Sequence, residues 1–467
     1  MNARHATVTT LRAAGRMPST PFQLMLADGR VLVLRQLLRV LPGRRITGIA
    51  DIDGATVVAK LFIAAHGAQR HWQRELRGMQ RLLEHDLPTP KQLAAGELLS
   101  GGYYVLNELI ENAQNLTAFQ NTIPVAPLSK IFAMIGRMHA HGLIHGDAHH
   151  GNFLFQTERI FILDGDAIRD SRSHREAVDN LALALAQLPP ATVRAQHANL
   201  LAAYRRENPE QSLDWRYLEK TVVRIHRRRL RHYLKKCLRD CSQFLIVREP
   251  ERFVAMVRSE AEFLSPIVSD PDTWLKTGVP LKLGKTATLA MITHHGRQLV
   301  IKRYNIKGTW HALSRCWRPS RAWHSWIEAH RLGFFGIATP RPLAMLEQRL
   351  GPFRREAWTV TEYCPGAGLA DHLAAYSESA PPEAVLENIQ KTFQSLADAN
   401  ITHGDLKASN LLWQDGHLVF IDLDAMKQHA SQCGFRHAWK KDRQRLLQNW
   451  PATSPLHKIL DTLTKTI

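Results

Sequence analysis

The sequence predicts an α+β chain of two tandem domains, each with a β-rich first lobe and a helical second lobe. Two observations support this prediction. A segment that begins His-Gly-Asp occurs twice, at residues 145 and 403, and each copy follows short alternating patterns and then a helical pattern. The copies lie 258 residues apart (403 − 145), and a chain of 467 residues accommodates two domains of this length.

Each copy carries an Asp, an Asn five residues further on and a second Asp seventeen residues further on: Asp147, Asn152 and Asp164, then Asp405, Asn410 and Asp422. In kinases the first Asp orients the attacking hydroxyl, whereas the Asn and the second Asp hold the Mg²⁺ ions that bridge the ATP phosphates. The spacing therefore predicts two protein-kinase-like domains, with catalytic Asp147 and Asp405, that use ATP and Mg²⁺.

The first domain is expected to span residues 22–265, after an N-terminal extension of residues 1–21. Alternating apolar residues indicate strands, and apolar residues three or four positions apart indicate helices. In order, the patterns predict a hairpin of residues 22–26 and 31–34, a strand over 57–60, a helix over 69–84, a strand over 103–106 and a helix over 127–141.

The second domain is expected to span residues 274–467, with a short helical lobe. A turn-rich break, Ser265-Pro266 and Ser269-Asp-Pro-Asp272, precedes it. In order, the patterns predict a hairpin of residues 289–292 and 299–302, a helix over 321–332 and a strand over 358–362.

Each domain also has a lysine at the end of a strand, Lys60 or Lys302, and a glutamate on the next helix, Glu75 or Glu328. In kinases this lysine holds the α- and β-phosphates and the glutamate pairs with it. A strand-ending lysine alone is more often solvated, but here an Asp-Asn-Asp set follows it. We therefore expect both Lys–Glu pairs to bind the cofactor.

Lys407, two residues after Asp405, is expected to neutralise charge on the transferring phosphoryl group, and His149 takes its place in the first domain. Asp166 and Asp424 lie two residues after the second Asp of each set. They either assist metal binding or cap the end of the strand.

A glycine, Gly146 or Gly404, precedes each catalytic Asp, where protein kinases carry an arginine that contacts a phosphorylated activation loop. This difference argues against activation by loop phosphorylation and favours kinases of sugars and small molecules.

The net charge of +19 favours polyanionic partners: nucleic acid, anionic lipid or a phosphorylated substrate. The densest basic run, residues 224–239, has apolar residues at helical spacing. It is either a solvated helix face or a surface for an anionic membrane. No nucleic-acid-binding module is recognisable, so no nucleic acid is expected.

Five scattered cysteines fit a reducing compartment, and no signal peptide or long apolar run is evident, so a cytoplasmic protein is expected. The Lys–Glu separation is 15 residues in the first domain (75 − 60) and 26 in the second (328 − 302). The added segment mixes cations with indoles: Lys307, Arg315, Arg318, Arg321, Trp310, Trp317, Trp323 and Trp326. It forms either an interfacial or phosphosugar surface, or a helix whose tryptophans pack on the sheet.

Several motifs of the second domain resemble the bacterial lipopolysaccharide core kinase family: Lys302-Arg-Tyr-Asn305, Arg321-Ala-Trp323, Glu328-Ala-His-Arg-Leu-Gly333 and Gly336-Ile-Ala-Thr-Pro-Arg-Pro342. The resemblance covers most of residues 275–430. The first domain is similar more loosely, through Leu41-Pro-Gly-Arg-Arg45, Lys60-Leu-Phe62 and Gly142-Leu-Ile-His-Gly-Asp147.

The resemblance implies an ATP- and Mg²⁺-dependent kinase of a core sugar, heptose or Kdo. Its implied partners are the lipopolysaccharide core–lipid A intermediate and the anionic inner face of the cytoplasmic membrane, to which the protein would be peripheral. Two alternatives remain: a kinase of a protein or a soluble small molecule, and a kinase-fold scaffold with one or both domains inactive. The second copy, with Lys407, is the stronger catalytic candidate.

Overall fold

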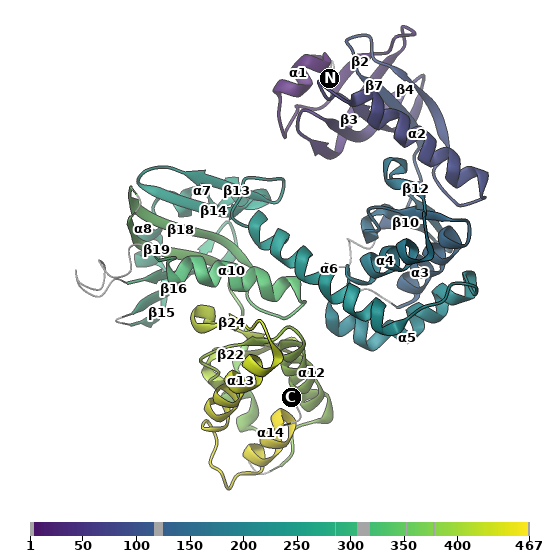
Figure 1. Ribbon diagram of the computed structural model, residues 1–467. Coiled ribbons are helices and arrows are strands. Elements are labelled where there is room, and N and C mark those ends of the chain that lie inside the picture. The colour runs from purple at the N-terminus through teal and green to yellow at the C-terminus, as the bar shows by residue number, and fades with distance from the viewer. Residues whose placement is uncertain are drawn as a thin grey trace. The chain divides into compact units, whose positions relative to one another are not determined.

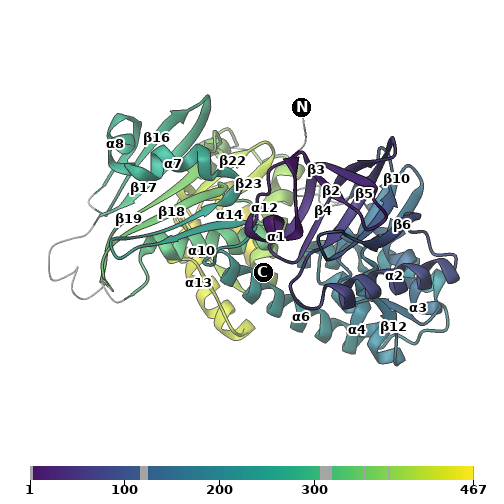
Figure 2. The same cartoon turned by 90° about the horizontal axis from the view of Figure 1, so that it is seen from above.

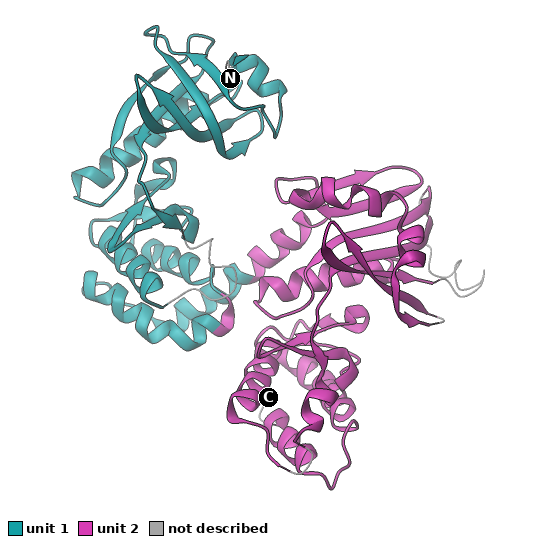
Figure 3. Ribbon diagram, turned by 180° about the vertical axis from the view of Figure 1, so that it is seen from behind, with its two compact units in different colours: residues 1–188, 192–226 teal, residues 189–191, 227–467 magenta. Residues whose placement is uncertain are grey.

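The computed structural model describes residues 4–115, 125–284, 286–305, 318–351, 353–376 and 379–465. The chain divides into two compact units, residues 1–188 with 192–226 and residues 189–191 with 227–467 (Figure 3). Helix α6 (Trp215–Lys236) runs across this division. The division thus falls near residue 226, earlier than the break expected at residues 265–274.

The first lobe of unit 1 is a seven-stranded sheet, which Figure 1 shows beside helix α2 (Ala68–Glu84). Its strands, in spatial order, are β1 (Arg4–His5), β2 (Phe22–Met25), β3 (Val31–Leu41), β4 (Arg45–Ile52), β5 (Ala55–Phe62), β7 (Tyr103–Glu108) and β6 (Gln92–Glu97). Helix α2 covers the sheet, and its Trp72 indole donates to the backbone oxygen of Tyr104 at 3.0 Å.

The expected N-terminal extension is largely part of this lobe. Strand β1 pairs in parallel with β2, and helix α1 (Val8–Ala13) buries Val8 and Leu11 in the core of the sheet. The short apolar stretch of α1 is too brief for a helical pattern to stand out in the sequence. The prediction of a separate extension over residues 1–21 is therefore wrong for residues 4–13.

The second lobe of unit 1 is helical and carries the first His-Gly-Asp segment on short strands. Its main elements are α3 (Val125–Ala140), β8 (Gln114–Asn115), β9 (Leu143–His145), β10 (Phe153–Gln156), β11 (Arg159–Ile162), β12 (Ile168–Asp170), α4 (His174–Leu185), α5 (Pro190–Glu207) and the first part of α6. Its core gathers apolar side chains from α3, α4 and α5, with Ile135, Leu181 and Tyr204 fully buried.

The first lobe of unit 2 is also a seven-stranded sheet. Its strands, in spatial order, are β13 (Phe244–Arg248), β14 (Arg252–Val257), β18 (Pro342–Leu350), β19 (Phe353–Glu362), β17 (Arg297–Tyr304), β16 (Ala287–His294) and β15 (Val279–Leu283). Strand β14 pairs with β18, for example Val254 opposite Leu346. Residues 244–257, which the predicted boundary assigned to the first domain, therefore form β13 and β14 of the second sheet, where their backbone hydrogen bonds are satisfied.

Helices cover both faces of this sheet. Alternate residues of a strand face opposite sides, and Phe253 and Val254 of β14 accordingly join different clusters. Val254 packs with α7 (Ala261–Ser269) and α8 (Pro271–Thr277), whereas Phe253 packs with α10 (Arg321–Phe334), as Figure 2 helps to follow.

The second lobe of unit 2 carries the second His-Gly-Asp segment. Its elements are β20 (Ala367–Gly368), α11 (Leu369–Ala374), α12 (Glu383–Asp398), β21 (Ile401–Thr402), β22 (Leu411–Gln414), β23 (His417–Phe420), β24 (Lys427–Gln428), α13 (Gln432–Leu447) and α14 (Pro455–Lys465). Phe393 of α12, Phe420 of β23 and Phe435 of α13 fill one core. Both units thus follow the predicted order of a β-rich lobe and then a helical lobe.

Candidate functional site

A cavity of about 710 Å³ lies between the two lobes of unit 2. Lys302 of β17 lines it from the sheet, and Asp405, Asn410 and Asp422 line it from the loops that follow β21 and β23. Its volume is within the range of about 300–1,000 Å³ that is usual for small-molecule sites. The structure thus brings four predicted site residues of the second domain to one cavity.

Two carboxylates hold Lys302. Its Nζ atom lies 2.6 Å from Asp422 Oδ1 and 3.0 Å from Asp424 Oδ1. Although burial would raise the pKa of the Asp422 carboxyl, the Lys302 ammonium keeps that pKa below its ordinary value. Asp424 Oδ1 also accepts from the hydroxyls of Tyr304 (2.9 Å) and Ser325 (2.8 Å). Asp424 is therefore the centre of the contacts that fix Lys302.

The expected pairing of Lys302 with Glu328 is not what the structure shows. Glu328 Oε2 instead accepts from Arg331 Nε at 2.8 Å on the same helix. Side chains three residues apart on a helix face each other, and this ion pair is almost fully buried. The prediction that Glu328 holds the cofactor-binding lysine is therefore wrong in this geometry.

The helix register explains the difference. Thr89 and Thr339 make the same contact in the two units, each donating to a backbone oxygen of the strand before the metal-binding Asp at 2.9 Å. Glu75 lies 14 residues before Thr89 (89 − 75), and the residue 14 before Thr339 is Ser325 (339 − 325). Counting back from Thr89-Pro90 and Thr339-Pro340 therefore identifies Ser325, rather than Glu328, as the counterpart of Glu75. This signal was present in the sequence.

Two cations flank the predicted base. Asp405 Oδ1 lies 2.7 Å from Arg445 Nη1, and its Oδ2 lies 3.2 Å from Lys407 Nζ. Asn410 donates through Nδ2 to the Asp405 backbone oxygen at 2.9 Å, which leaves its Oδ1 as a ligand atom. Lys407 lies where the sequence predicts it, but Arg445, forty residues away (445 − 405), gave no local signal.

The sequence also gave no signal for Asp442. This buried residue of α13 accepts from the backbone N–H groups of His403 (2.6 Å) and Gly404 (2.9 Å). Burial raises the pKa of its carboxyl. Gly404 itself has φ +80°, and a Cβ there would lie 2.3 Å from the Ala425 backbone oxygen. The backbone conformation therefore requires glycine at position 404. This is a second reason, besides the expected substrate class, why an arginine does not precede the catalytic Asp.

In unit 1 the predicted Lys–Glu pair forms. Lys60 Nζ lies 2.5 Å from Glu75 Oε1, and Glu75 has no exposed surface. Asn152 donates to the Asp147 backbone oxygen at 2.8 Å, as Asn410 does in unit 2. Asp164 contacts two cations, Arg45 Nη1 at 3.2 Å and Lys60 Nζ at 3.6 Å.

Asp166 and Asp424 have different contacts in the two units. Asp166 holds helix α2 through His71 Nδ1 and Arg74 Nε, each at 3.1 Å, whereas Asp424 holds Lys302. Among the described residues, no group of three or more His, Cys, Asp or Glu side chains is arranged to bind a metal. Asn410 and Asp422 nevertheless offer only oxygen atoms, which suit Mg²⁺ shared with phosphates.

The structure describes four of the eight cations and tryptophans named in the segment added between Lys302 and Glu328. Lys307, Trp310, Arg315 and Trp317 lie outside the described residues. Trp326 is buried against the sheet, and Trp323 packs on Phe253 of β14. These two tryptophans therefore support the packing interpretation, whereas Arg321, 3.7 Å from Asp424, lies in the cavity.

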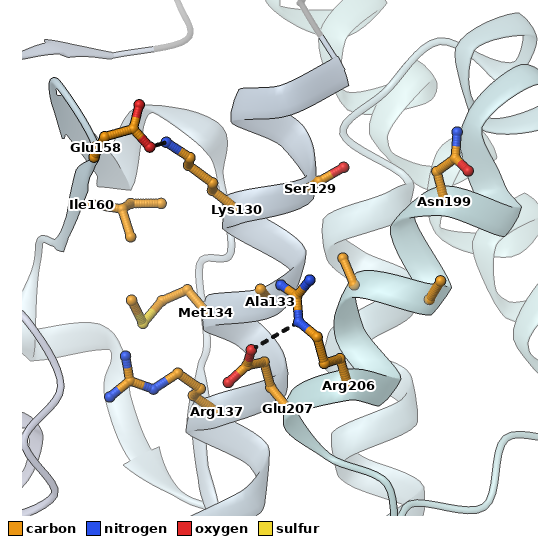
Figure 4. Close-up of a pocket in the computed structure, with 12 residues that line it drawn as sticks. Ser129, Lys130, Ala133, Met134, Arg137, Glu158, Ile160, Asn199, Arg206 and Glu207 are labelled. Carbon is orange, nitrogen blue, oxygen red and sulfur yellow. Dashed lines mark hydrogen bonds and ion pairs between the residues drawn. The ribbon is translucent and has the colours of Figure 1, made fainter.

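Unit 1 has a second hollow, of about 580 Å³, outside the predicted site (Figure 4). Residues of helices α3 and α5 and Ile160 of strand β11 line it. Ion pairs flank it, Lys130 with Glu158 at 2.7 Å and Arg206 with Glu207 at 3.2 Å. It contains no predicted catalytic or metal-binding residue.

Helix α6 carries the basic run. Its Leu230 is buried in the core of unit 2, while Arg227, Arg228, Arg231 and Lys235 are exposed. Throughout the described part of the chain, no helix combines the length and apolar character needed to span a membrane.

The profile of the lipopolysaccharide kinase (Kdo/WaaP) family matches residues 63–204 and 272–453, one stretch for each unit. No curated protein matches the chain.

Two solved structures match part of the chain. One, "WaaP in complex with acyl carrier protein", is 21% identical over 42% of this chain and 89% of that chain, with a TM-score of 0.33. The other, "Structure of vaccinia related kinase 3", is 13% identical over 49% of this chain and 79% of that chain, with a TM-score of 0.28.

Proposed function

Because the chain belongs to the lipopolysaccharide kinase (Kdo/WaaP) family, we propose that it transfers phosphate from ATP to a sugar hydroxyl of the lipopolysaccharide core. The acceptor is the core–lipid A intermediate at the cytoplasmic face of the inner membrane. The second unit performs the transfer. The family match supports a lipopolysaccharide kinase, and the specific acceptor, its location and the role of each residue are the proposal.

The observation that carries the proposal is the arrangement of charges in the cavity of unit 2. Lys302, which contacts Asp424, would bind the α- and β-phosphates. Asn410 and Asp422 would hold Mg²⁺, which neutralises charge on the phosphates when bound. Asp405 orients the sugar hydroxyl and accepts its proton.

Lys407 and Arg445 complete this arrangement. Both contact the Asp405 carboxylate and are about half exposed, so they can also reach an incoming anion. Positive charge placed beside the transferring phosphoryl group stabilises the transition state more than the ground state.

The basic face of α6 supports a membrane-bound acceptor. Arg227, Arg228, Arg231 and Lys235 are exposed on unit 2. Each basic residue near an anionic bilayer contributes about 1 kcal/mol of binding free energy. Reversing Arg227, Arg228 and Arg231 to Glu should release the protein from vesicles that contain anionic phospholipid. Reversing three exposed cations outside α6, Lys91, Arg159 and Lys458, to Glu changes the net charge by the same six units and controls for net charge.

The test of catalysis is phosphorylation of purified core–lipid A with ATP and Mg²⁺, read by mass spectrometry. Asp405→Ala should lower turnover by about 10³-fold or more, the scale for a central catalytic group. Asp147→Ala is the matched control in the first unit. Wild-type turnover in Asp405→Ala would move the active site to unit 1, and wild-type turnover in the double variant would refute the kinase proposal.

The choice of acceptor is tested separately. Delipidated core oligosaccharide should be phosphorylated, and a panel of proteins and soluble sugars should not. Preferential phosphorylation of a protein would favour the alternative in which the acceptor is not lipopolysaccharide.

A further inference from the structure

The aspartates predicted to bind metal contact different cations in the two units. In unit 1, Arg45 Nη1 lies 3.2 Å from Asp164 Oδ1, and the two side chains are only 13% and 15% exposed. Lys60 adds a second cation at 3.6 Å from the same oxygen. The carboxylate that would receive a divalent cation is therefore already neutralised by a buried guanidinium.

Unit 2 has no arginine at the corresponding place. Arg45 of β4 pairs with Phe62, two residues after Lys60, and Ala287 of β16 pairs with Tyr304, two residues after Lys302. Ala287 thus stands where unit 1 has Arg45. Its methyl side chain lines the cavity and cannot contact a carboxylate.

The residues beside the catalytic Asp also differ, because unit 2 has two cations there and unit 1 has other residues at the same positions. Asp405 contacts Lys407 and Arg445, but His149 (407 − 258) and Gln187 (445 − 258) occupy these positions in unit 1. The same offset relates the capping residues of α4 and α13, Ser173 and Ser431. His149 Nδ1 accepts from the Gly151 N–H at 3.0 Å and so acts as a local cap. Among the described residues, unit 1 therefore adds an arginine to the lysine at its metal-binding Asp, where Asp422 of unit 2 contacts Lys302, and it lacks the lysine and arginine that contact the base in unit 2.

These residues do not fit Mg²⁺ in unit 1. A divalent cation at Asp164 would have to displace Arg45 and would then lie close to two positive side chains. The same two side chains suit a polyphosphate, because a guanidinium offers five donors in a planar fork that matches phosphate oxygens. One of these donors points to Asp164, and others remain for an anion.

We propose that unit 1 binds the phosphate chain of a nucleoside triphosphate without a divalent cation, with Arg45 in place of the metal, and that it does not transfer the phosphoryl group. Lys60 and Arg45 contact the phosphates directly. The proposal rests on the proposed function only in assigning the transfer to unit 2.

The test is calorimetric titration of the full-length protein with ATP, in Mg²⁺ and in excess EDTA. The wild-type protein should bind ATP at two sites in Mg²⁺ and at one site in EDTA. Arg45→Met should weaken the EDTA-resistant site by about tenfold or more, the effect of roughly one charge-assisted hydrogen bond. Lys302→Met should remove the Mg²⁺-dependent site and leave the EDTA-resistant site intact.

Two further variants make the result decisive. Arg45→Lys keeps the charge without the planar fork, so it should show intermediate affinity even if Arg45→Met is poorly folded. Ala287→Arg introduces the guanidinium into unit 2 and should weaken its Mg²⁺-dependent binding, with thermal unfolding as the control for folding.

Absence of ATP binding in EDTA, or an EDTA-resistant site unchanged in Arg45→Met, would overturn the proposal. Because the readout is binding, a failure to phosphorylate core sugars would refute the proposed function without deciding this inference.

Discussion

The contacts of Lys302 allow a direct comparison of Asp424 with Glu328, the residue that the sequence first suggested. Asp424→Asn removes one charge and keeps the shape, and the new amide oxygen still accepts from Tyr304 and Ser325. The same amide oxygen can also accept from Lys302, so the variant removes the charge of this contact and leaves Asp422 as the carboxylate paired with Lys302. Since Asp422 must also serve the metal when ATP is bound, Lys302 loses its dedicated anionic partner.

The expected magnitude follows from the geometry. Lys302 Nζ is 3.0 Å from Asp424 Oδ1, and the two side chains are 13% and 19% exposed, so solvent screens the interaction little. A hydrogen bond to a charged group contributes about 1.5–3 kcal/mol. Each 1.36 kcal/mol corresponds to a factor of ten. Asp424→Asn should therefore lower kcat/KM for ATP by about 10- to 150-fold.

Glu328→Gln is the matched control, because it also removes one buried carboxylate from the same lobe. It breaks the ion pair with Arg331. We expect a loss of about 1–3 kcal/mol in stability, the cost of an unsatisfied buried group, and kcat/KM within about twofold once the folded fraction is taken into account.

The assay is the initial rate of core phosphorylation at varied ATP concentration, with thermal unfolding of each variant in parallel. If Glu328→Gln loses as much kcat/KM as Asp424→Asn while remaining folded, the assignment of Asp424 is wrong. Equal kcat/KM in Asp424→Asn and the wild type would contradict it as well.

Three other predictions concern stability. Glu75→Ala leaves buried Lys60 without its closest partner and should destabilise unit 1 by about 3–5 kcal/mol, seen in calorimetry as a lower unfolding temperature of unit 1. Asp442→Ala leaves two backbone N–H groups unsatisfied and should lower both the stability of unit 2 and kcat, whereas intact kcat would show that Asp442 does not position the catalytic loop. Burial lowers the pKa of His139 to about 4. The unfolded chain therefore binds this proton more readily, and unit 1 should lose about 3 kcal/mol as pH falls from about 6.5 to 4. His139→Gln should reduce this slope in urea titrations, and His145, whose pKa burial also lowers, accounts for a remaining slope.

The parts of the site that the sequence predicted depend on short stretches of chain. Asp405, Lys407 and Asn410 lie in one loop, and Asp422 follows the next hairpin. Their relative positions are set by a few turns, so residue spacing is enough to predict them. The order of a β-rich and a helical lobe was likewise predicted from local patterns, and the order of the helices and strands confirms it.

The errors involve contacts between residues far apart in the chain. The Glu328 assignment failed because an insertion separates β17 from α10, so that counting from Lys302 no longer gives the helix register. Asp442 and Arg445 reach the catalytic loop only through the packing of α13. Apolar patterning identifies the buried face of that helix but does not say which loop lies beside it.

The pairing of β14 with β18 has a practical consequence for separating the two units. A fragment that began at residue 274 would lack β13 and β14 and would expose the β18 edge, including Ala344, Met345 and Leu346. An unpaired apolar strand edge is a template for association with other chains. Such a fragment should aggregate, and one that begins at residue 227 should retain a covered edge and stay monomeric.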